Sequence, residues 1–527
     1  MEHYDVMIKG GKIVDGSGNP WFKGDVAVRG DKIAKIGDLA SHEAEMEIDA
    51  TGLLICPGFI DVHTHTDDSF IINPKADSKI RQGVTTEILG NCGNSLAPIT
   101  ELGKSFEDKR FKELGIEWDW NTVAEYLDRL EKVGMPVNVG TLVGHGTVRA
   151  SIMGYEARAP SEKELEGMKE LVDQGMKDGA FGLSTGIKYA PGVYADTQEI
   201  IELSKVVSKY GGVYATHIRN QGDHLIESVE EAITIGREAG CPVQIAHLKV
   251  KGRMNWGKSF NMLRIIDEAR DEGVDITFDQ YPYIAASTGA SAITPKWARE
   301  GGTDSFLERL KDPEQRQRIE KGVIEQEDWT GSLKLLVCKF DPDPTYEGKS
   351  IAEIAELRGK TRQATMCDLI LEAEGRVPLI LFFGWDLDVK AIMTHHAMMV
   401  GSDGSSLASY GELGKGKPHP RNYGAFPRFL GKYVIREKFL SLEDGIRRMT
   451  SFPASRYGLL GRGLLKTGGY ADVTLVDPDR VIDKATFQDP HQYAEGVEYV
   501  LVNGALTVER EEYNGAQAGK ALRHSVS

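Results

Sequence analysis

Several histidines stand where apolar segments of the sequence end. These residues are the best candidates in this sequence for binding a metal ion. His63 and His65 flank one threonine at the end of the segment FIDVHTH. In a strand, side chains two residues apart point to the same side, so both imidazoles can reach one metal ion. A lone His-x-His motif is weak evidence for such a site, and further ligands must be found elsewhere in the chain.

Two more histidines and an aspartate supply those ligands. His217 ends the apolar part of VYATHIRN, His247 that of VQIAHLK, and Asp403 follows MMV in MMVGSDG. Imidazole and carboxylate are common metal ligands. Four histidines and a carboxylate at the ends of four apolar segments, of which only His63 and His65 share one, are difficult to explain by core packing. The sequence therefore predicts a metal centre.

The elements that must position these residues are eight short apolar segments, which we predict to be strands. They are FIDVHTH, TTEILGNC, VNVGTLVGHG, AFGLSTG, VYATHIRN, VQIAHLK, ITFDQYPY and MMVGSDG. Amphipathic stretches such as 161–179 and 224–240 separate several of them and have the apolar spacing of helices. Alternating strands and helices predict parallel strands, and eight such units predict a closed (β/α)₈ barrel. Barrel enzymes carry their active sites at the C-terminal strand ends, where the predicted ligands fall.

The two ends of the chain differ from this middle part. Both contain short alternating segments separated by Gly and Asp-Gly, which are typical of antiparallel hairpins. We predict that residues 1–57 and 456–527 form one small β-sandwich domain around a barrel of residues 58–455. A charged stretch of about 284–362, between the seventh and eighth strands, is too long for an ordinary loop. We interpret it as an inserted subdomain over the barrel mouth, either a lid or a surface elaboration.

The composition argues against several kinds of partner. With 79 acidic against 63 basic residues, the chain is a poor match for nucleic acid or an anionic membrane. Five scattered cysteines do not suggest a disulfide framework. The sequence has no apolar run of membrane-spanning length, and its start, MEHYDVMIKGG, lacks the pattern of a signal peptide. We expect a cytoplasmic protein with a small-molecule substrate, in an oligomeric state that the sequence does not predict.

The motifs together resemble the amidohydrolase superfamily, through PGFIDVHTH, the two single histidines, SDG and the β segments at both ends. Within it, the chain is similar to the D-aminoacylase (N-acyl-D-amino-acid deacylase) family. The motifs GVTTEILGNCG, FGLSTGIKYAPG, THIRNQ, AHLK and PHPRNYGAFPR carry that resemblance, which covers nearly the whole chain. It implies zinc-dependent hydrolysis of the amide bond of N-acyl-D-amino acids, which releases a carboxylate and a free D-amino acid. The D configuration is implied by the resemblance alone.

The resemblance also implies how the metal is held. Many binuclear superfamily members bridge their metals with a carboxylated lysine, and Cys92 in GNCG matches the cysteine that replaces it in this family. A bound metal deprotonates such a thiol. The implied ligands of a tight zinc are Cys92, His217 and His247. The implied ligands of a second position, empty or weakly filled, are His63, His65 and Asp403. Whether one metal or two act in catalysis stays open.

The substrate end of the site is likewise implied. Tyr189, Lys249 and Arg421 match positions that bind the substrate carboxylate in the family, and a phenol, an ammonium and a guanidinium together suit that task. Tyr281, after the seventh strand, is interpreted as a substrate-binding residue that lines the acyl pocket. In the implied mechanism, metal-bound hydroxide attacks the amide carbonyl, and Asp403 transfers the proton to the leaving amine.

Three alternatives remain. A dipeptidase for peptides with a C-terminal D-residue differs only in the acyl group. A cyclic amidase resembling hydantoinase or dihydropyrimidinase is disfavoured by Cys92 and Arg421. A non-catalytic amidohydrolase-like assembly protein is disfavoured because all the predicted ligands are present.

Overall fold

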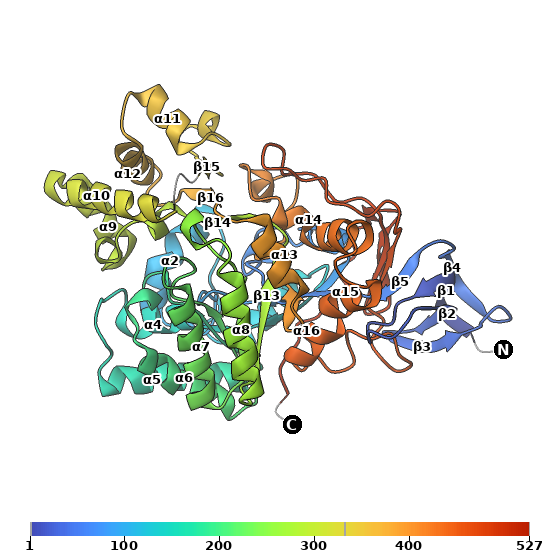
Figure 1. Ribbon diagram of the computed structural model, residues 1–527. Coiled ribbons are helices and arrows are strands. Elements are labelled where there is room, and N and C mark those ends of the chain that lie inside the picture. The colour runs from blue at the N-terminus through green and yellow to red at the C-terminus, as the bar shows by residue number, and fades with distance from the viewer. Residues whose placement is uncertain (1–2, 331–333, 526–527) are drawn as a thin grey trace.

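Strands from both ends of the chain share one sheet in the computed structural model, which describes residues 3–330 and 334–525. Its N-terminal strands are β1 (His3–Ile13), β2 (Phe22–Arg29), β3 (Lys32–Gly37), β4 (Glu43–Asp49) and β5 (Leu54–Pro57). Its C-terminal strands are β18 (Val473–Val476), β19 (Val497–Val502), β20 (Ala505–Glu509) and β21 (Glu512–Tyr513). The order is β21-β20-β19-β18-β5-β1-β2-β3, with β4 also paired to β1. Figure 1 shows the blue N-terminal strands at one side of the molecule, next to red C-terminal segments.

The hairpin prediction is correct for only part of this sheet. β1, β2 and β3 pair in antiparallel fashion, but β4 and β5 run parallel to β1, one after the other along its edge. The prediction of antiparallel pairing is therefore wrong for β4, whereas β5 pairs in parallel with β1 and in antiparallel fashion with β18. Alternation of apolar residues shows that one face of a strand is buried, but it does not show which way the neighbouring strand runs.

Each of the eight segments predicted to be central strands does contain a strand. These strands are β6 (Phe59–Asp61), β7 (Val84–Leu89), β8 (Asn138–Thr141) with β9 (Val143–Gly144), β10 (Gly182–Gly186), β11 (Val213–His217), β12 (Val243–Ile245), β13 (Ile276–Gln280) and β17 (Met398–Val400). They form two parallel sheets, β6-β7-β8 and β17-β13-β12-β11-β10-β9. The fold is thus mixed α/β with parallel sheets.

Helices cover the outer side of these strands (Figure 1). Between the strands lie α5 (Glu162–Lys177), α6 (Thr197–Ser208), α7 (Leu225–Ala239) and α8 (Ser259–Asp271). A capping box of Ser161 and Glu164 starts α5, and Gly240 in the left-handed conformation ends α7. The other α-helices outside the inserted segment are α1 (Ser69–Ile72), α2 (Glu101–Glu113), α3 (Val123–Val133), α4 (His145–Met153), α13 (Asp386–Thr394), α14 (Arg421–Pro427), α15 (Leu442–Met449) and α16 (Ser451–Arg456).

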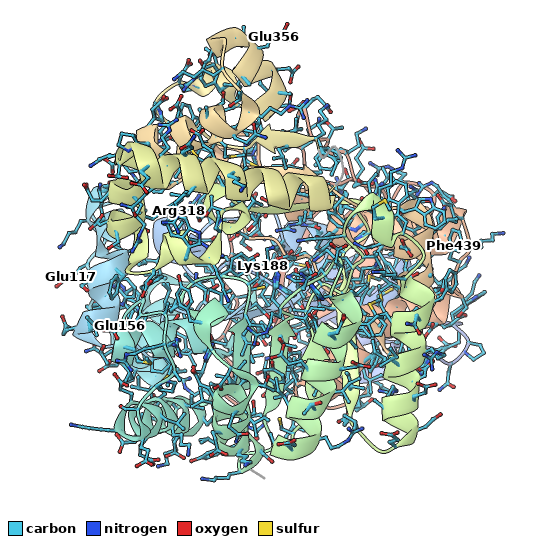
Figure 2. The ribbon with its side chains drawn as sticks, turned by 60° about the vertical axis from the view of Figure 1, so that its left-hand side comes forward. Glu117, Glu156, Lys188, Arg318, Glu356 and Phe439 are labelled. Atoms are coloured by element: carbon cyan, nitrogen blue, oxygen red, sulfur yellow. The ribbon has the colours of Figure 1, made fainter. Side chains whose placement is uncertain are left out.

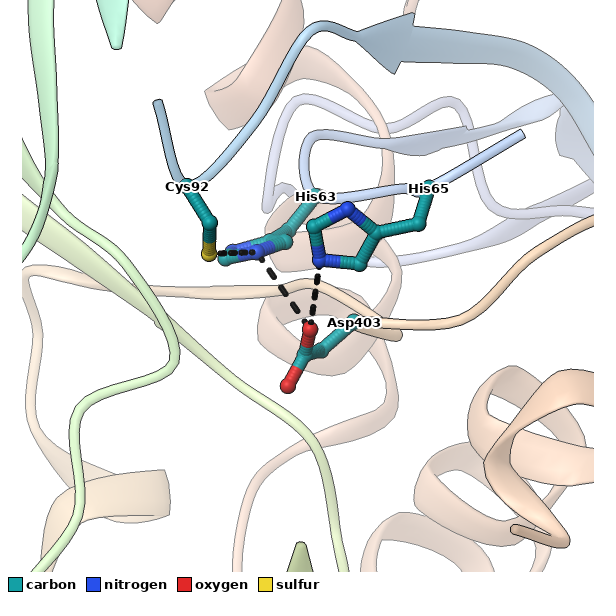
Figure 3. A group of neighbouring side chains, drawn as sticks. All are labelled: His63, His65, Cys92 and Asp403. Carbon is teal, nitrogen blue, oxygen red and sulfur yellow. Dashed lines mark hydrogen bonds and ion pairs between the residues drawn. The ribbon is translucent and has the colours of Figure 1, made fainter. Parts of the chain in front are cut away.

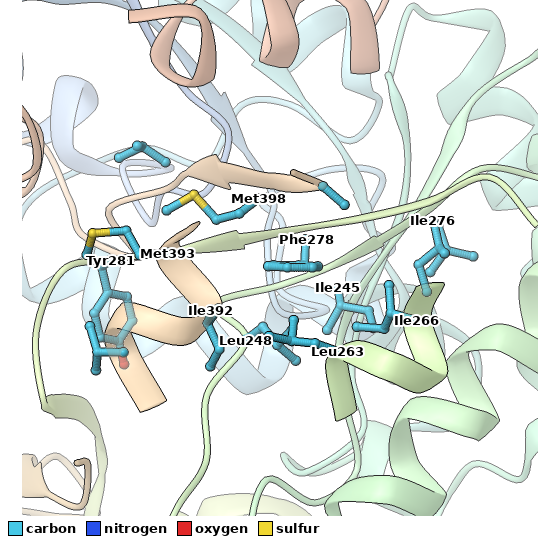
Figure 4. Packing of buried hydrophobic residues seen from close by; sticks show 14 of the residues in the cluster. Ile245, Leu248, Leu263, Ile266, Ile276, Phe278, Tyr281, Ile392, Met393 and Met398 are labelled. Carbon is cyan, nitrogen blue, oxygen red and sulfur yellow. The ribbon is translucent and has the colours of Figure 1, made fainter. Parts of the chain in front are cut away.

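The apolar faces of these helices hold the strands in place. Ile245 and Phe278 on β12 and β13 lie in one buried cluster with Leu263 and Ile266 of α8 (Figure 4). Full burial of such a side chain contributes about 1.5–3 kcal/mol. The strands that carry the predicted ligands at their ends are therefore held in place by a packed hydrophobic core.

The inserted segment has a core of its own. Strands β14 (Ala285–Gly289), β15 (Leu335–Val337) and β16 (Pro378–Phe382) form an antiparallel sheet in the order β14-β16-β15. With them lie α9 (Gly302–Lys311), α10 (Pro313–Thr330), α11 (Ile351–Arg358) and α12 (Arg362–Glu372), seen in yellow at the upper left of Figure 1. β16, the middle strand of this sheet, lies after residue 362, which was the predicted end of the insertion.

No helix in the described ranges has both the length and the apolar character needed to cross a membrane.

Candidate active site

The thiol of Cys92 lies among three histidines. Its Sγ is 3.3 Å from His63 Nε2, 3.7 Å from His217 Nδ1 and 3.5 Å from His247 Nε2. Sulfur and nitrogen ligands of one tetrahedral zinc ion lie roughly 3.6 Å apart, given the usual Zn–S and Zn–N bond lengths. The Cys92, His217 and His247 donors therefore have the spacing of a shared metal ion.

A second group of possible ligands adjoins the first and is formed by His63, His65, Cys92 and Asp403 (Figure 3). The Oδ1 atom of Asp403 is 3.0 Å from His65 Nε2 and 3.5 Å from His63 Nε2. Cys92 belongs to both groups. A thiolate there can lie between two metal positions, so the structure brings together all six residues that the sequence predicted as ligands.

The charges in this cluster favour metal binding. Burial opposes ionisation of the Cys92 thiol, but His63 and His247 together hold its pKa well below the ordinary value. Burial lowers the pKa of His247 to about 4, and with the neighbouring His247 it holds that of His217 well below its usual range. In the group of Cys92, His217 and His247, a thiolate beside neutral imidazoles is the form in which these side chains bind a metal. In the second group, burial opposes protonation of His63, but Asp279 and Cys92 hold its pKa well above the ordinary value. The buried Nε2 atom of His217 also has no hydrogen-bond partner among the described residues.

The backbone at the cluster is unusual. Cys92, His247 and Asp403 all have positive φ angles, of 53°, 37° and 52°. Non-glycine residues rarely adopt this conformation, and it recurs at active sites, where the surrounding structure holds it in place. A Cβ atom on Gly186 would lie 1.9 Å from the carbonyl oxygen of Cys92, so only glycine lets the GNCG turn approach the end of β10.

Two supporting groups were not predicted from the sequence. Asp279 on β13 accepts a hydrogen bond from the backbone N–H of His247 at 2.8 Å, and its Oδ1 is 3.1 Å from His63 Nδ1. It therefore orients one histidine of each group. Lys79, fully buried, donates to Asp61 Oδ2 at 2.5 Å and also contacts Ser402. In the sequence, the signal for Asp279 was an aspartate inside the apolar segment ITFDQYPY, which was predicted to be a strand.

The four predicted substrate residues lie close to the metal ligands. Tyr189, Lys249 and Arg421 line a cavity of about 670 Å³ that also contains Cys92 and Asp403. Arg421 Nη1 donates to Asp403 Oδ2 at 2.7 Å. Tyr281 is 2% exposed, and its ring centre lies 5.1 Å from Lys249 Nζ and 5.0 Å from Arg421 Cζ. The Tyr281 ring therefore packs against these two cations.

The lining of the cavity is chemically mixed. It includes the cations Lys249 and Lys251 and the hydroxyl-bearing residues of β14. The apolar lining comes mainly from the loop after Cys92, from α2 and from the segment after α2: Leu96, Ile99, Phe106, Phe111 and Trp118. Such a lining suits a molecule with an anionic part and an apolar part.

The other histidines have structural partners. His145 Nε2 lies 2.8 Å from Glu199, and His419 Nε2 lies 3.0 Å from the carbonyl oxygen of Ala285. His395 and His396 adjoin Asp267 in a third group of possible ligands. However, the backbone N–H of Ala397 donates to His395 Nδ1. This bond places the ring proton on Nε2, the atom that faces Asp267, and so argues against a metal there. All five cysteines are free and buried.

Comparisons with known proteins find relatives that match nearly the whole chain. The model of the Amidohydrolase family matches residues 46–508. A D-aminoacylase from Alcaligenes xylosoxydans xylosoxydans is 36% identical over 99% of this chain and 98% of its own length. An N-acyl-D-glutamate deacylase from the same organism is 35% identical over 100% of this chain and 98% of its length. The crystal structure of N-acyl-D-glutamate deacylase from Bordetella bronchiseptica, complexed with zinc and a phosphonate mimic of the tetrahedral intermediate, has a TM-score of 0.83. It is 33% identical and covers 99% of this chain and 100% of that one.

Proposed function

We propose, from the premise that this chain belongs to the amidohydrolase family, that it hydrolyses the amide bond of N-acyl-D-amino acids. The products are a carboxylate and a free D-amino acid. The observation that carries the proposal is the cluster of Cys92, His217 and His247 in one cavity with Lys249 and Arg421. It combines a metal-binding group with cations that suit a substrate carboxylate.

We infer that the resident metal is zinc. Cys92, His217 and His247 would hold the tight ion, since their donor atoms have the spacing and the protonation that zinc requires. His63, His65 and Asp403, with Cys92 as a shared ligand, would hold a second ion. When bound, zinc supplies a nucleophile at neutral pH and polarises the substrate carbonyl.

The residues of the chain supply the proton transfer. Burial opposes ionisation of Asp403, but Arg421 first and then His247 hold its pKa well below the usual value, so it is a carboxylate at neutral pH. As a carboxylate, it can accept the proton of the attacking water and deliver it to the amide nitrogen. An amide nitrogen leaves poorly unless it is protonated, so one group acting twice completes the reaction.

Lys249 and Arg421 are proposed to bind the substrate α-carboxylate. Both are buried, at 6% and 5% exposure, and both line the cavity. Tyr189 adds a phenol at the same side, and Tyr281 packs against both cations. A carboxylate bound there places its neighbouring amide toward Cys92 and Asp403.

We also infer that the two parallel sheets close into one (β/α)₈ barrel. Backbone hydrogen bonds from Asp403 to His63 and from His65 to Gly404, of 2.8 and 2.9 Å, join the end of β17 to the end of β6. Only Leu142 separates β8 from β9, and its N–H donates to Leu89 at 3.0 Å. The division into 1–57 with 456–527, 58–455 and an insertion, and the cytoplasmic location, remain proposals.

A substrate panel tests the proposed reaction. Purified protein would be incubated with N-acetyl-D-amino acids, with dipeptides that end in a D-residue, and with hydantoin and dihydropyrimidine rings, and product amine or ring opening would be quantified. We expect release of amine from the N-acetyl-D-amino acids. Ring opening without any release from linear amides would replace the proposal with a cyclic amidase, and cleavage of dipeptides alone would replace it with a dipeptidase.

A further inference from the structure

One cation of the cavity is not used by the proposed reaction. Lys251 is 9% exposed, lies two residues after Lys249 in the loop that follows β12, and lines the same cavity. Burial lowers the pKa of its ammonium well below the usual value, and the charges of Lys188 and Lys249 lower it further. Such a group is stable as a cation only when an anion lies beside it.

Lys188 adds positive charge near Lys251, and Arg299 adds positive charge near Lys188. Arg299, also 9% exposed, donates from Nη1 to the backbone carbonyl oxygen of Lys188 at 3.1 Å, and its Nε is buried without a partner. Burial and then Arg299 lower the pKa of Lys188 to about 8. Figure 2 shows Lys188 between the inserted helix that carries Arg318 and the helices around the parallel strands.

The protein itself does not neutralise three of these cations. Among the side chains that the structure describes, no carboxylate forms an ion pair with Lys249, Lys251 or Arg299. Asp403 is the nearest anion of the group, and it pairs with Arg421. One substrate α-carboxylate brings a single negative charge to this end of the cavity. At least one buried cation is then left without an opposite charge.

The position of Lys251 indicates which part of the substrate would carry a second negative charge. The α-carboxylate is assigned to Lys249 and Arg421, and the side chain of the amino acid leaves the same carbon atom. The acyl group lies on the far side of the scissile bond, and we assign it to the apolar part of the lining, which includes Leu96, Ile99 and Phe106. A charged acyl group would therefore meet an unsuitable surface, whereas a charged side chain would meet Lys251.

We propose that Lys251, supported by Arg299 and Lys188, binds a second carboxylate on the substrate side chain, so that the preferred substrates are N-acyl derivatives of acidic D-amino acids. This rests on the proposed deacylase function and specifies its substrate class. Overall identity does not distinguish between these substrate classes, since the chain is 36% identical to a D-aminoacylase and 35% identical to an N-acyl-D-glutamate deacylase. The buried cations Lys251, Arg299 and Lys188 are the basis of the proposed preference for acidic side chains.

The test compares substrates that differ only in side-chain charge. N-acetyl-D-glutamate and N-acetyl-D-glutamine have nearly the same shape, and we expect kcat/KM to be at least about tenfold higher for the glutamate, mainly through KM. Equal or better hydrolysis of the glutamine compound would overturn the inference and leave the deacylase function intact. Hydrolysis of neither compound, nor of any other N-acetyl-D-amino acid, would overturn the function and the inference together.

Substitutions assign the preference to residues. Lys251→Met should reduce the glutamate-to-glutamine ratio of kcat/KM by about tenfold, through a loss of kcat/KM for N-acetyl-D-glutamate. Lys251→Arg should retain the preference. Arg253→Met is the matched control, because Arg253 is an exposed cation of the same loop, and it should leave the ratio unchanged. An unchanged ratio in Lys251→Met would contradict the assignment.

Two further arms complete the design. If Lys251→Met does not fold, as judged by circular dichroism, Arg299→Gln is measured in its place and should lower the same ratio. N-succinyl-D-alanine and N-acetyl-D-alanine differ in the charge of the acyl group. A preference for the succinyl compound without a preference for glutamate over glutamine would place the second anion on the acyl side and refute the proposal.

Discussion

Arg421 donates a hydrogen bond from Nη1 to Oδ2 of Asp403 at 2.7 Å, and both side chains are buried. The other carboxylate oxygen, Oδ1, lies 3.0 Å from His65 Nε2. A charge-assisted bond to one oxygen fixes the orientation of the carboxylate and leaves the second oxygen facing the metal ligands. Arg421 thus links the substrate end of the cavity to the group that we assign to proton transfer.

Replacing Asp403 tests that assignment. Asp403→Asn keeps the shape of the side chain but removes the base, so kcat should fall by about 10²–10⁴-fold. The zinc bound by Cys92, His217 and His247 should remain, as measured by elemental analysis. A variant that keeps more than about a tenth of the activity would be incompatible with the proton-transfer role, given the usual size of that effect.

Cys92 should determine metal content. Cys92→Ala removes the only thiolate of the cluster, and the tight zinc should be lost from purified protein. Cys241→Ala is the control, because Cys241 is a buried free cysteine in an apolar cluster away from the cavity, and it should keep full zinc occupancy. Equal zinc content in the two variants would transfer the ligand role to other residues.

The proposed binding of the substrate α-carboxylate by Lys249 and Arg421 predicts an effect that depends on the substrate. Lys249→Met should raise KM for N-acyl-amino acids by about tenfold or more, since an ion pair with the substrate is lost. N-acyl amines of the same size, which lack the carboxylate, should show no comparable change. Lys249 gives a cleaner test than Arg421, because Arg421 also orients Asp403. The same loss with both substrate types would show that Lys249 acts in some other way.

Asp279 is expected to act through the ligands that it orients. It contacts His63 Nδ1 and the backbone of His247, and Gln244 donates to its other oxygen at 3.0 Å. Asp279→Asn should lower zinc affinity by about 10–100-fold, as loss of a group that orients metal ligands typically does. Competition with a chelator measures that affinity. Unchanged affinity would restrict Asp279 to a role in the fold.

The positions of the proposed ligands were predictable because they depend on local periodicity. His63 and His65 alternate with Thr64, His217 is the last residue of β11, and His247 lies two residues beyond β12. The same reasoning places Lys249 two residues beyond His247, and the structure shows it lining the cavity.

What the sequence could not supply are relations between distant strands. The contact of Asp279 with His63 joins residues 216 positions apart, and no local pattern specifies it. Tyr281 follows β13 as expected, but only the packed structure shows that it lies against Lys249 and Arg421. The direction of β4 and β5 is also set by the partner strand rather than by their own residues.

The central claim is zinc-dependent hydrolysis of N-acyl-D-amino acids, and paired enantiomers test it most directly. Zinc-loaded and chelator-stripped protein would be incubated with N-acetyl-D-glutamate and N-acetyl-L-glutamate, and with the D and L forms of N-acetylmethionine, and free amine would be quantified. We predict release from D substrates only, lost on stripping and restored by added zinc. Release from L substrates at the same rate, or equal activity in stripped protein that contains no metal, would contradict the account.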